Sequence, residues 1–292
     1  MRYAYRIVDV FTERAFAGNQ LAVVLDAEGL EPDRMQVIAR EFNFSETTFV
    51  TPSTAAGCDW RVRIFTPNAE LPMAGHPTIG TAVTLAALGR VAERTVLELG
   101  VGPTPVRVRP GWAEMDQRPP AFGPEHPGPA ALAEALSIGA DDLAGPELPP
   151  QSVSTGLPHL MVPVRSLAAM RRLRPRLDLL EAAMAAFPDQ AVYAFSREAE
   201  RPGSDAHCRM FAPHLGTPED PATGSAAGPL ACYLATRVVV GDGAVAFRFE
   251  QGLEMGRESL LEASVDRAAG AITAVRVGGA ARIVAEGWLT VE

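Results

Sequence analysis

The stretch RIFTPNAELPMAGHPTIGTA, residues 63–82, has a close relative later in the chain, FAPHLGTPEDPATGSAAG, residues 211–228. Both copies begin in a short strand with the spacing Arg-x-Phe-x-Pro, which starts at Arg63 in the first copy and at Arg209 in the second. Each copy then passes through a proline-rich turn and continues into a run of residues that are too apolar and too small for a surface helix. One short match of this kind could be a chance recurrence of a strand-to-helix joint.

A second correspondence lies upstream of each copy, in the same order. Residues 16–24 and residues 155–162 both read as a strand entered through a glycine, Gly18 in the first and Gly156 in the second. Two correspondences in one order make a duplication the better explanation, and a repeat decides the architecture before other signals do. The chain is therefore predicted to use one structural unit twice.

The two helices that follow the repeats, predicted over residues 77–88 and 224–236, are apolar on nearly every side. Such a helix must be enclosed, because a surface helix keeps a polar face. Many short strands flank both helices, so we expect an α+β fold in which two domains each curl a sheet around one central helix. A stretch dense in proline and glycine, residues 118–129, marks the domain boundary.

Composition excludes several kinds of partner. Of the 292 residues 47% are hydrophobic, which is enough for two domains with substantial cores. The net charge of -9 argues against nucleic acid, which selects a basic face. We see no run of about 18 apolar residues and no secretory leader, so we expect neither a membrane anchor nor export. Three cysteines without C-x-x-C spacing indicate neither a zinc site nor a disulfide framework, which fits a cytoplasmic protein.

Lysine is absent from the sequence, so all 26 basic residues are arginine. Pyridoxal phosphate enzymes, lysine-dependent aldolases, the Walker A loop and the protein kinases all use a lysine amine. These classes are excluded.

A helix that begins at a glycine turn directs unpaired N–H groups and the positive end of its dipole outward. Such a start favours an anion. The two repeats place one helix start near Gly75 and one near Gly224. If an approximate twofold relates them, they could hold one acidic ligand.

Three side chains are candidates for chemistry, and each also has a structural interpretation. Glu46 could be a solvated glutamate after a helix, or a partly buried carboxyl whose raised pKa suits proton transfer to and from carbon. His76 could simply cap a helix, or offer a neutral imidazole at a helix start. Asp220 could open a turn, since Asp-Pro is a common turn sequence, or assist in the site. The residues alone leave these alternatives open.

The remaining histidines have no spacing that suggests a metal site. His126, His159, His207 and His214 are scattered, and we interpret them as structural or solvated residues. Among them His159, in GLPHL, is the best candidate to line a binding site.

Five ordered blocks of sequence carry a family resemblance. They are DVFTERAFAGNQLAVV (9–24), AREFNFSETTFV (39–50), the two repeat stretches at 63–82 and 211–228, and FEQGLEMGR (249–257). Over nearly its whole length the chain resembles the PhzF-like isomerases, a phenazine-biosynthesis-like family that shares its fold with diaminopimelate epimerase.

The resemblance implies two pseudosymmetric domains with an active site in the cleft between them, where the central helices begin. It also places the last strand with the first domain. The predicted domains are therefore residues 1–117 with 280–292, and residues 118–279. The resemblance further implies a homodimer.

The resemblance also implies roles for individual residues. It makes Glu46 the catalytic acid/base, assisted by His76 and Asp220, with no metal and no cofactor. The residues expected to hold a substrate carboxylate through backbone and hydroxyl groups are Gly75, Gly224 and Ser225.

The predicted function is a cofactor-independent isomerisation in which Glu46 moves a proton within a small carboxylic acid. Ala74 and Pro221 stand where diaminopimelate epimerase has its two catalytic cysteines, so a two-thiol racemisation is not expected. One alternative is a racemase or epimerase of amino or hydroxy acids, with Glu46 and Asp220 serving opposite faces. Another is a non-catalytic binding protein on the same fold.

Overall fold

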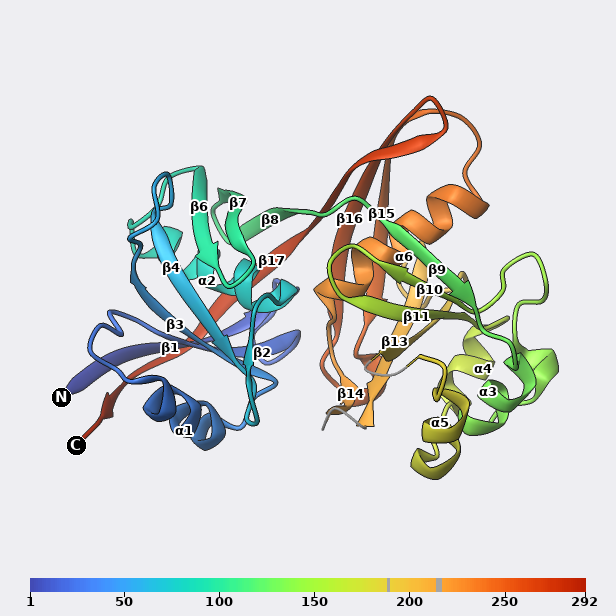
Figure 1. Cartoon of the computed structure of the whole chain (residues 1–292), viewed down its shortest axis with the longest axis horizontal. Helices are drawn as coiled ribbons and strands as arrows, with labels where there is room; N and C mark the ends of the chain where they lie inside the picture. Colours follow the sequence, from blue (N-terminus) through green and yellow to red (C-terminus); the bar gives the residue numbers. More distant parts are fainter. Residues whose placement is uncertain (188–189, 214–216) are drawn as a thin grey trace. The chain divides into compact units, whose positions relative to one another are not determined.

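The computed structural model describes residues 1–187, 190–213 and 217–292. The chain divides into two compact units, unit 1 formed by Met1–Asp116 with Val277–Glu292 and unit 2 formed by Gln117–Arg276 (Figure 1). The sequence places the corresponding boundaries after residues 117 and 279. Of the histidines named above, His214 lies outside the described residues.

Unit 1 combines a curled sheet with two helices. Its elements are β1 (Arg2–Val10), β2 (Asn19–Val24), α1 (Pro32–Phe42), β3 (Glu46–Pro52), β4 (Trp60–Phe65), β5 (Glu70–Leu71), α2 (Gly75–Ala87), β6 (Arg94–Leu99), β7 (Gly102–Arg109), β8 (Trp112–Gln117) and the end of β17 (Ala271–Thr290).

The sheet of unit 1 closes into a ring. The end of β17 pairs antiparallel with β1, β1 pairs with β2, and β2 runs parallel to β3. From β3 the ring continues through β4, β6, β7 and β8, and β8 pairs again with β17. Closure leaves no free strand edge along this ring. The last strand of the chain therefore completes the first unit.

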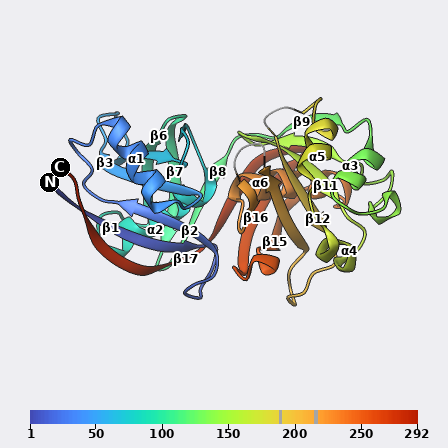
Figure 2. The same ribbon diagram turned by 90° about the horizontal axis from the view of Figure 1, so that it is seen from below.

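Helix α2 is the enclosed helix of unit 1. Its residues 75–85 are all buried, and it packs against β1, β2, β3 and β7. Gly80 permits this close packing, because a Cβ there would lie only 2.6 Å from the Leu21 side chain and 2.7 Å from that of Val10. The N- and C-termini meet on the same unit, where the Val291 N–H donates to the Met1 carbonyl (Figures 1 and 2).

Helix α1 connects the parallel strands β2 and β3 and covers the outside of the sheet. Its first residue is Pro32, a position that proline favours. It ends where Asn43 adopts the left-handed conformation, with φ of 53°. Met35, Ile38 and Ala39 form its buried face. The turn after Asn43 delivers the chain directly into β3 at Glu46.

Unit 2 has a similar core and more helices on the outside. Its elements are β9 (Ala121–Glu125), α3 (Pro129–Ala135), η1 (Ala140–Asp142), β10 (Gln151–Ser154), β11 (Pro158–Pro163), α4 (Leu167–Arg172), α5 (Leu177–Ala183), β12 (Ala191–Ser196), β13 (Ala206–Ala212), β14 (Thr217–Asp220), α6 (Gly224–Arg237), β15 (Gly243–Gln251), η3 (Leu253–Met255), β16 (Ser259–Ala268) and the start of β17.

Two sets of helices have different places in unit 2. Helix α6 is buried along most of its length and packs against β10, β11, β15 and β16. Helices α3, α4 and α5 share an apolar cluster with strands β11, β12 and β13, to which Leu132, Met170, Leu180 and Phe211 belong (Figure 2). The outer helices thus take the place that α1 has in unit 1.

The pairing pattern of unit 2 repeats that of unit 1 strand by strand. In unit 1, β2 is parallel to β3, and β3 is antiparallel to β4. The other edge of β4 pairs with a parallel β6 near its start and with an antiparallel β5 near its end. In unit 2, β11, β12, β13, β14 and β15 reproduce this pattern with the same directions. The duplication predicted from the repeats is present as a duplicated topology.

The Arg-x-Phe-x-Pro spacing forms the same brace in both units. Arg63 of β4 binds Glu70 through two parallel contacts of 2.7 Å. Arg209 of β13 binds Glu219 in the same way, with two contacts of 2.8 Å. Each guanidinium also lies over the phenylalanine two residues on, at 5.1 and 4.9 Å from the ring centre. The motif recurs because it ties a strand to its short partner strand.

Two predicted helix ranges need correction. The helix predicted over 77–88 begins earlier, at Gly75, because Pro77 fits anywhere in a first turn, where its missing N–H costs nothing. The helix predicted over 224–236 extends to Arg237. The stretch 118–129, where the sequence places the domain boundary, also contains β9, which pairs with β10.

Candidate active site

The start of helix α2 has the character of an anion site. Gly75 is its first residue, Ala74 precedes it in an extended conformation, and no side chain caps the turn. The first turn contains no acidic residue that would neutralise the positive end of the dipole. This end of the helix therefore favours a negatively charged group.

Glu46 lies beside this helix start. It is the first residue of β3 and pairs in the parallel ladder with Leu21 of β2. Its Oε2 atom lies 3.4 Å from Nε2 of His76, and the Glu46 side chain is 16% exposed against 6% for His76. The glutamate is therefore not the solvated residue of the structural interpretation, since most of its side chain is covered.

His76, the second residue of α2, is held from its other side by Asn19. The Asn19 Nδ2 atom is 3.2 Å from Nδ1 of the imidazole. Burial lowers the pKa of His76 to about 3, against the opposing effect of a hydrogen bond with the Gln20 backbone. The ring is therefore neutral at physiological pH, as a histidine at a helix start should be.

The Glu46 and His76 atoms that face each other accommodate one proton between them. A carboxylate oxygen facing a bare ring nitrogen would be repulsive, and a carboxyl O–H facing a ring N–H would oppose two donors. The Asn19 amide nitrogen can only donate, so Nδ1 accepts there and the ring proton lies on Nε2, facing the carboxyl oxygen of Glu46. A distance of 3.4 Å is long for a hydrogen bond, and such contacts often tighten when a substrate binds.

The start of helix α6 in unit 2 brings Ser225 and His159 together. Gly224 is the first residue of α6, and Ser225 follows it. Nε2 of His159, on β11, lies 3.1 Å from the Ser225 hydroxyl oxygen. Burial lowers the pKa of His159 to about 4, so this imidazole too is neutral. Its Nδ1 atom is buried and has no hydrogen-bond partner among the described residues.

Asp220 ends β14, four residues before Gly224, and is buried. Its Oδ2 atom accepts a 2.6 Å hydrogen bond from the Thr223 hydroxyl. Gln251, at the end of β15, donates to the backbone carbonyl of Asp220 at 2.7 Å. The aspartate is therefore part of the turn that leads into α6, as its structural interpretation requires, and its place beside the helix start is compatible with an assisting role.

The predicted site residues thus fall into two groups. Unit 1 contains Glu46, Gly75 and His76, and unit 2 contains His159, Asp220, Gly224 and Ser225. The structure brings Glu46 to His76 in the first group and His159 to Ser225 in the second. That both groups serve one ligand stays a prediction from the resemblance.

Sequence reasoning missed three residues that support these groups. Asn19 holds the His76 ring, and Thr223 and Gln251 hold Asp220. All three lie inside the sequence blocks that carry the resemblance. Asn19 and Gln251 lie 57 and 31 positions from these partners, so a single sequence does not indicate the contacts.

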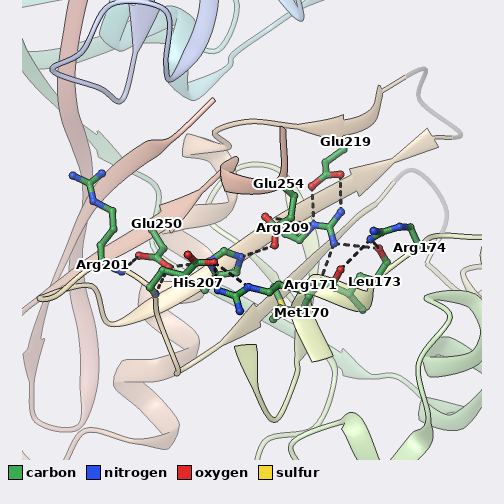
Figure 3. Close-up of polar contacts among 11 residues, drawn as sticks. Met170, Arg171, Leu173, Arg174, Arg201, His207, Arg209, Glu219, Glu250 and Glu254 are labelled. Carbon is green, nitrogen blue, oxygen red and sulfur yellow. Dashed lines mark hydrogen bonds and ion pairs between the residues drawn. The ribbon is translucent and has the colours of Figure 1, made fainter. Parts of the chain in front are cut away.

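The histidines interpreted as structural have such roles. His126 is stacked on Phe187, and its Nε2 contacts the carbonyl of Ala183 at 2.8 Å. His207 is fully buried on β13, with Nδ1 2.8 Å from Glu250 and Nε2 3.0 Å from Glu254 (Figure 3).

No group of three or more histidine, cysteine or acidic side chains that could hold a metal ion occurs among residues 1–187, 190–213 and 217–292. In the same residues, no helix combines the length and the apolarity that crossing a membrane requires.

Comparison with known proteins agrees with this architecture. The family model described as phenazine biosynthesis-like protein matches residues 8–287. An uncharacterized isomerase of Mesorhizobium japonicum and the trans-2,3-dihydro-3-hydroxyanthranilate isomerase of Pseudomonas aeruginosa are each 38% identical to this chain, over 98% of both chains compared.

Solved structures give the same result. The crystal structure of a PhzF family protein from Bacillus anthracis has a TM-score of 0.93 at 28% identity and covers all of both chains. A hydroxyproline epimerase from Agrobacterium vitis has a TM-score of 0.63 at 13% identity, over 99% of this chain and 91% of its own, which shows the fold alone.

The duplicated curled sheets, each with its enclosed helix, define an α+β fold of the diaminopimelate epimerase type. The enzymes to which the chain is similar along nearly its full length define it as an isomerase. The chain belongs to the PhzF family of phenazine biosynthesis-like proteins.

Proposed function

We propose that this protein is a cofactor-independent isomerase in which Glu46 moves a proton from one carbon to another of a small carboxylic acid. The observation that supports this most directly is the contact between Glu46 and the neutral His76 at the start of α2. It places one titratable carboxyl, largely covered, beside a helix end that favours an anion.

The reaction is balanced within the substrate and the glutamate. Ionised Glu46 takes a proton from carbon, and the electron pair of that C–H bond delocalises into the adjacent unsaturated system and carboxylate. Protonated Glu46 then returns the proton to a second carbon, where a new C–H bond forms. The helix dipole and a neutral imidazole that can donate from Nε2 stabilise the delocalised anion between the two steps.

The position of Glu46 carries an acid/base in one unit alone, which favours isomerisation over an epimerisation that uses this position in both units. Thr47 pairs with Phe65, and Val192 pairs with the corresponding phenylalanine of unit 2, so Glu46 corresponds to Ala191. An epimerase of two-base type needs an acid/base on each face of the carbon. The duplicated scaffold has a carboxyl at this position in one unit and a methyl group in the other.

The substrate class follows from the relatives. A protein 38% identical to this chain is named trans-2,3-dihydro-3-hydroxyanthranilate isomerase, and its substrate is an unsaturated ring acid with amino and hydroxyl groups. We propose that this chain takes an unsaturated acid of that kind, held by backbone groups at Gly75 and Gly224 and by the Ser225 hydroxyl. A homodimer is part of the same proposal.

The test is turnover in heavy water. The wild-type enzyme is incubated with trans-2,3-dihydro-3-hydroxyanthranilate in D2O, and deuterium incorporation at carbon is followed by NMR. Glu46→Gln should lower turnover about a thousand-fold, because general acid–base groups contribute 10²–10⁴-fold. Glu41→Gln, at an exposed glutamate in the last turn of α1, is the matched control and should turn over normally.

Undiminished turnover in Glu46→Gln would rule out Glu46 as the shuttle. Inversion at one carbon without migration of the double bond would support the epimerase alternative instead. Binding without any exchange, across a set of unsaturated acids, would favour a binding protein.

A further inference from the structure

The turn Asp220–Thr223 is held by a buried hydrogen-bond network whose directions are fixed. Gln251 is fully buried at the end of β15. Its Nε2 atom lies 2.7 Å from the Asp220 carbonyl oxygen, which can only accept, and its Oε1 atom lies 3.1 Å from the Thr223 N–H, which can only donate. These two partners decide which end of the Gln251 amide is which.

The direction of the Thr223 hydroxyl follows from the Gln251 amide. The second hydrogen of Nε2 is donated to Oγ1 of Thr223 at 3.0 Å, so this oxygen is an acceptor there. Its single O–H is then left to donate to Oδ2 of Asp220 at 2.6 Å. Tyr193 extends this hydrogen-bond network, since its hydroxyl donates to Oε1 of Gln251 at 3.0 Å.

The Thr223 hydroxyl binds Asp220 and does not cap helix α6. It stands at the N-cap position of α6, where a threonine ordinarily accepts from an N–H of the first turn. Its side chain makes no such capping bond, and its hydroxyl donates to Asp220. A hydrogen bond donated to a buried carboxylate favours the ionised form.

We propose that Thr223 and Gln251 are positioning residues that hold Asp220 ionised and in one orientation beside the first turn of α6. Gln251 orients the Thr223 hydroxyl, and Thr223 transmits that orientation to the carboxylate. We call this chain of contacts, from Gln251 through Thr223 to Asp220, the relay. It rests on the proposed function, because that function gives Asp220 an assisting role. The ionisation of Asp220 can nevertheless be measured without turnover.

The test is the titration of Asp220 in the full chain. With [γ-¹³C]aspartate incorporated, the Asp220 resonance is assigned by its loss in Asp220→Asn and followed by NMR as the pH is lowered. Thr223→Val, which keeps the shape and removes the hydroxyl, should move the titration midpoint upward by about one pH unit. Thr223→Ser, which keeps the hydroxyl, should return it to within a few tenths of the wild-type value.

An unchanged midpoint in Thr223→Val would overturn the relay. If that variant does not fold, Thr223→Ala gives the same comparison without added bulk. Turnover separates the two proposals: an inactive Asp220→Asn with an unshifted Thr223→Val titration would overturn the relay and leave the function standing. If Asp220→Asn is fully active and Thr223→Val shifts the Asp220 titration, Asp220 is not part of the catalytic group and the relay stands.

Discussion

Two buried histidines of this protein are neutral and a third is charged, because their immediate neighbours differ. His76 and His159 are neutral, since burial lowers the pKa of each. Burial also acts against the charged form of His207, but hydrogen bonds to Glu250 and Glu254 outweigh it and raise the pKa of His207 to about 9. Two carboxylates facing both ring nitrogens require both nitrogens to donate. His207 is therefore a structural cation.

The pH dependence of stability should show this cation. A folded-state pKa of about 9, above the model value of 6.5, stabilises the fold fully below pH 6.5, and that stabilisation is lost as the pH rises through 9. The shift corresponds to about 3 kcal/mol. We expect the free energy of unfolding, measured in urea, to fall by about that amount between pH 6.5 and 10.

His207→Gln should remove this dependence, and His126→Gln should keep it, because the His126 ring contacts a backbone carbonyl and stacks on an aromatic ring. The difference between each variant and the wild type cancels groups that titrate elsewhere. A His207→Gln curve parallel to that of the wild type would show that His207 is not charged in the fold.

At the scale of elements, the end of β15 clamps the turn that precedes α6. Gly252 has a φ of 80°, and a Cβ there would overlap the carbonyl oxygens of Arg257 and Pro221. The Ser259 hydroxyl donates to the same Pro221 carbonyl at 2.9 Å. The block FEQGLEMGR is thus a structural partner of the block that contains Asp220.

Gly252→Ala should be strongly destabilising, by at least ~2 kcal/mol, because it adds a backbone clash to an unfavourable φ. Gly256→Ala is the matched control. Gly256 has a φ of 66° with no atom near the position of a Cβ, so only the conformational cost of about 1 kcal/mol applies. Thermal unfolding of the two variants measures the difference, and equal losses would show that Gly252 tolerates the Cβ.

At the scale of the whole molecule, unit 1 is built from two distant pieces of chain. The end of β17 lies between β1 and β8 and closes the ring. Ending the chain after Arg276 would leave β1 and β8 as open edges and expose the apolar face that surrounds α2. We expect such a chain to aggregate and to lose cooperative unfolding.

A chain ended after Thr290 is the control, because it keeps all of β17. It should elute as the full chain does in size-exclusion chromatography and lose the hydrogen bonds between Val291 and Met1 and the packing of Val291 on the apolar cluster that contains Tyr3. A chain ended after Arg276 that elutes and unfolds like the full chain would show that ring closure is not needed for folding.

The local signals in this sequence were strong enough to predict the fold class, the duplication and both enclosed helices. Repeated spacing and uniform apolarity are properties of neighbouring residues, so they can be recognised in the amino-acid sequence alone. The helix starts at Gly75 and Gly224 could be located for the same reason. The boundaries were less certain, since a proline in a first helical turn does not mark its first residue.

The chemistry of the candidate site depends on contacts between residues far apart in the chain. Glu46 could be distinguished from a solvated glutamate only when the fold brought it to His76, thirty positions later. Likewise, Gln251 reaches Asp220 only because β15 ends beside β14's turn, and His207 is charged only because Glu250 and Glu254 face its ring. Burial and hydrogen-bond partners set protonation, and both come from tertiary packing, which the order of residues does not display.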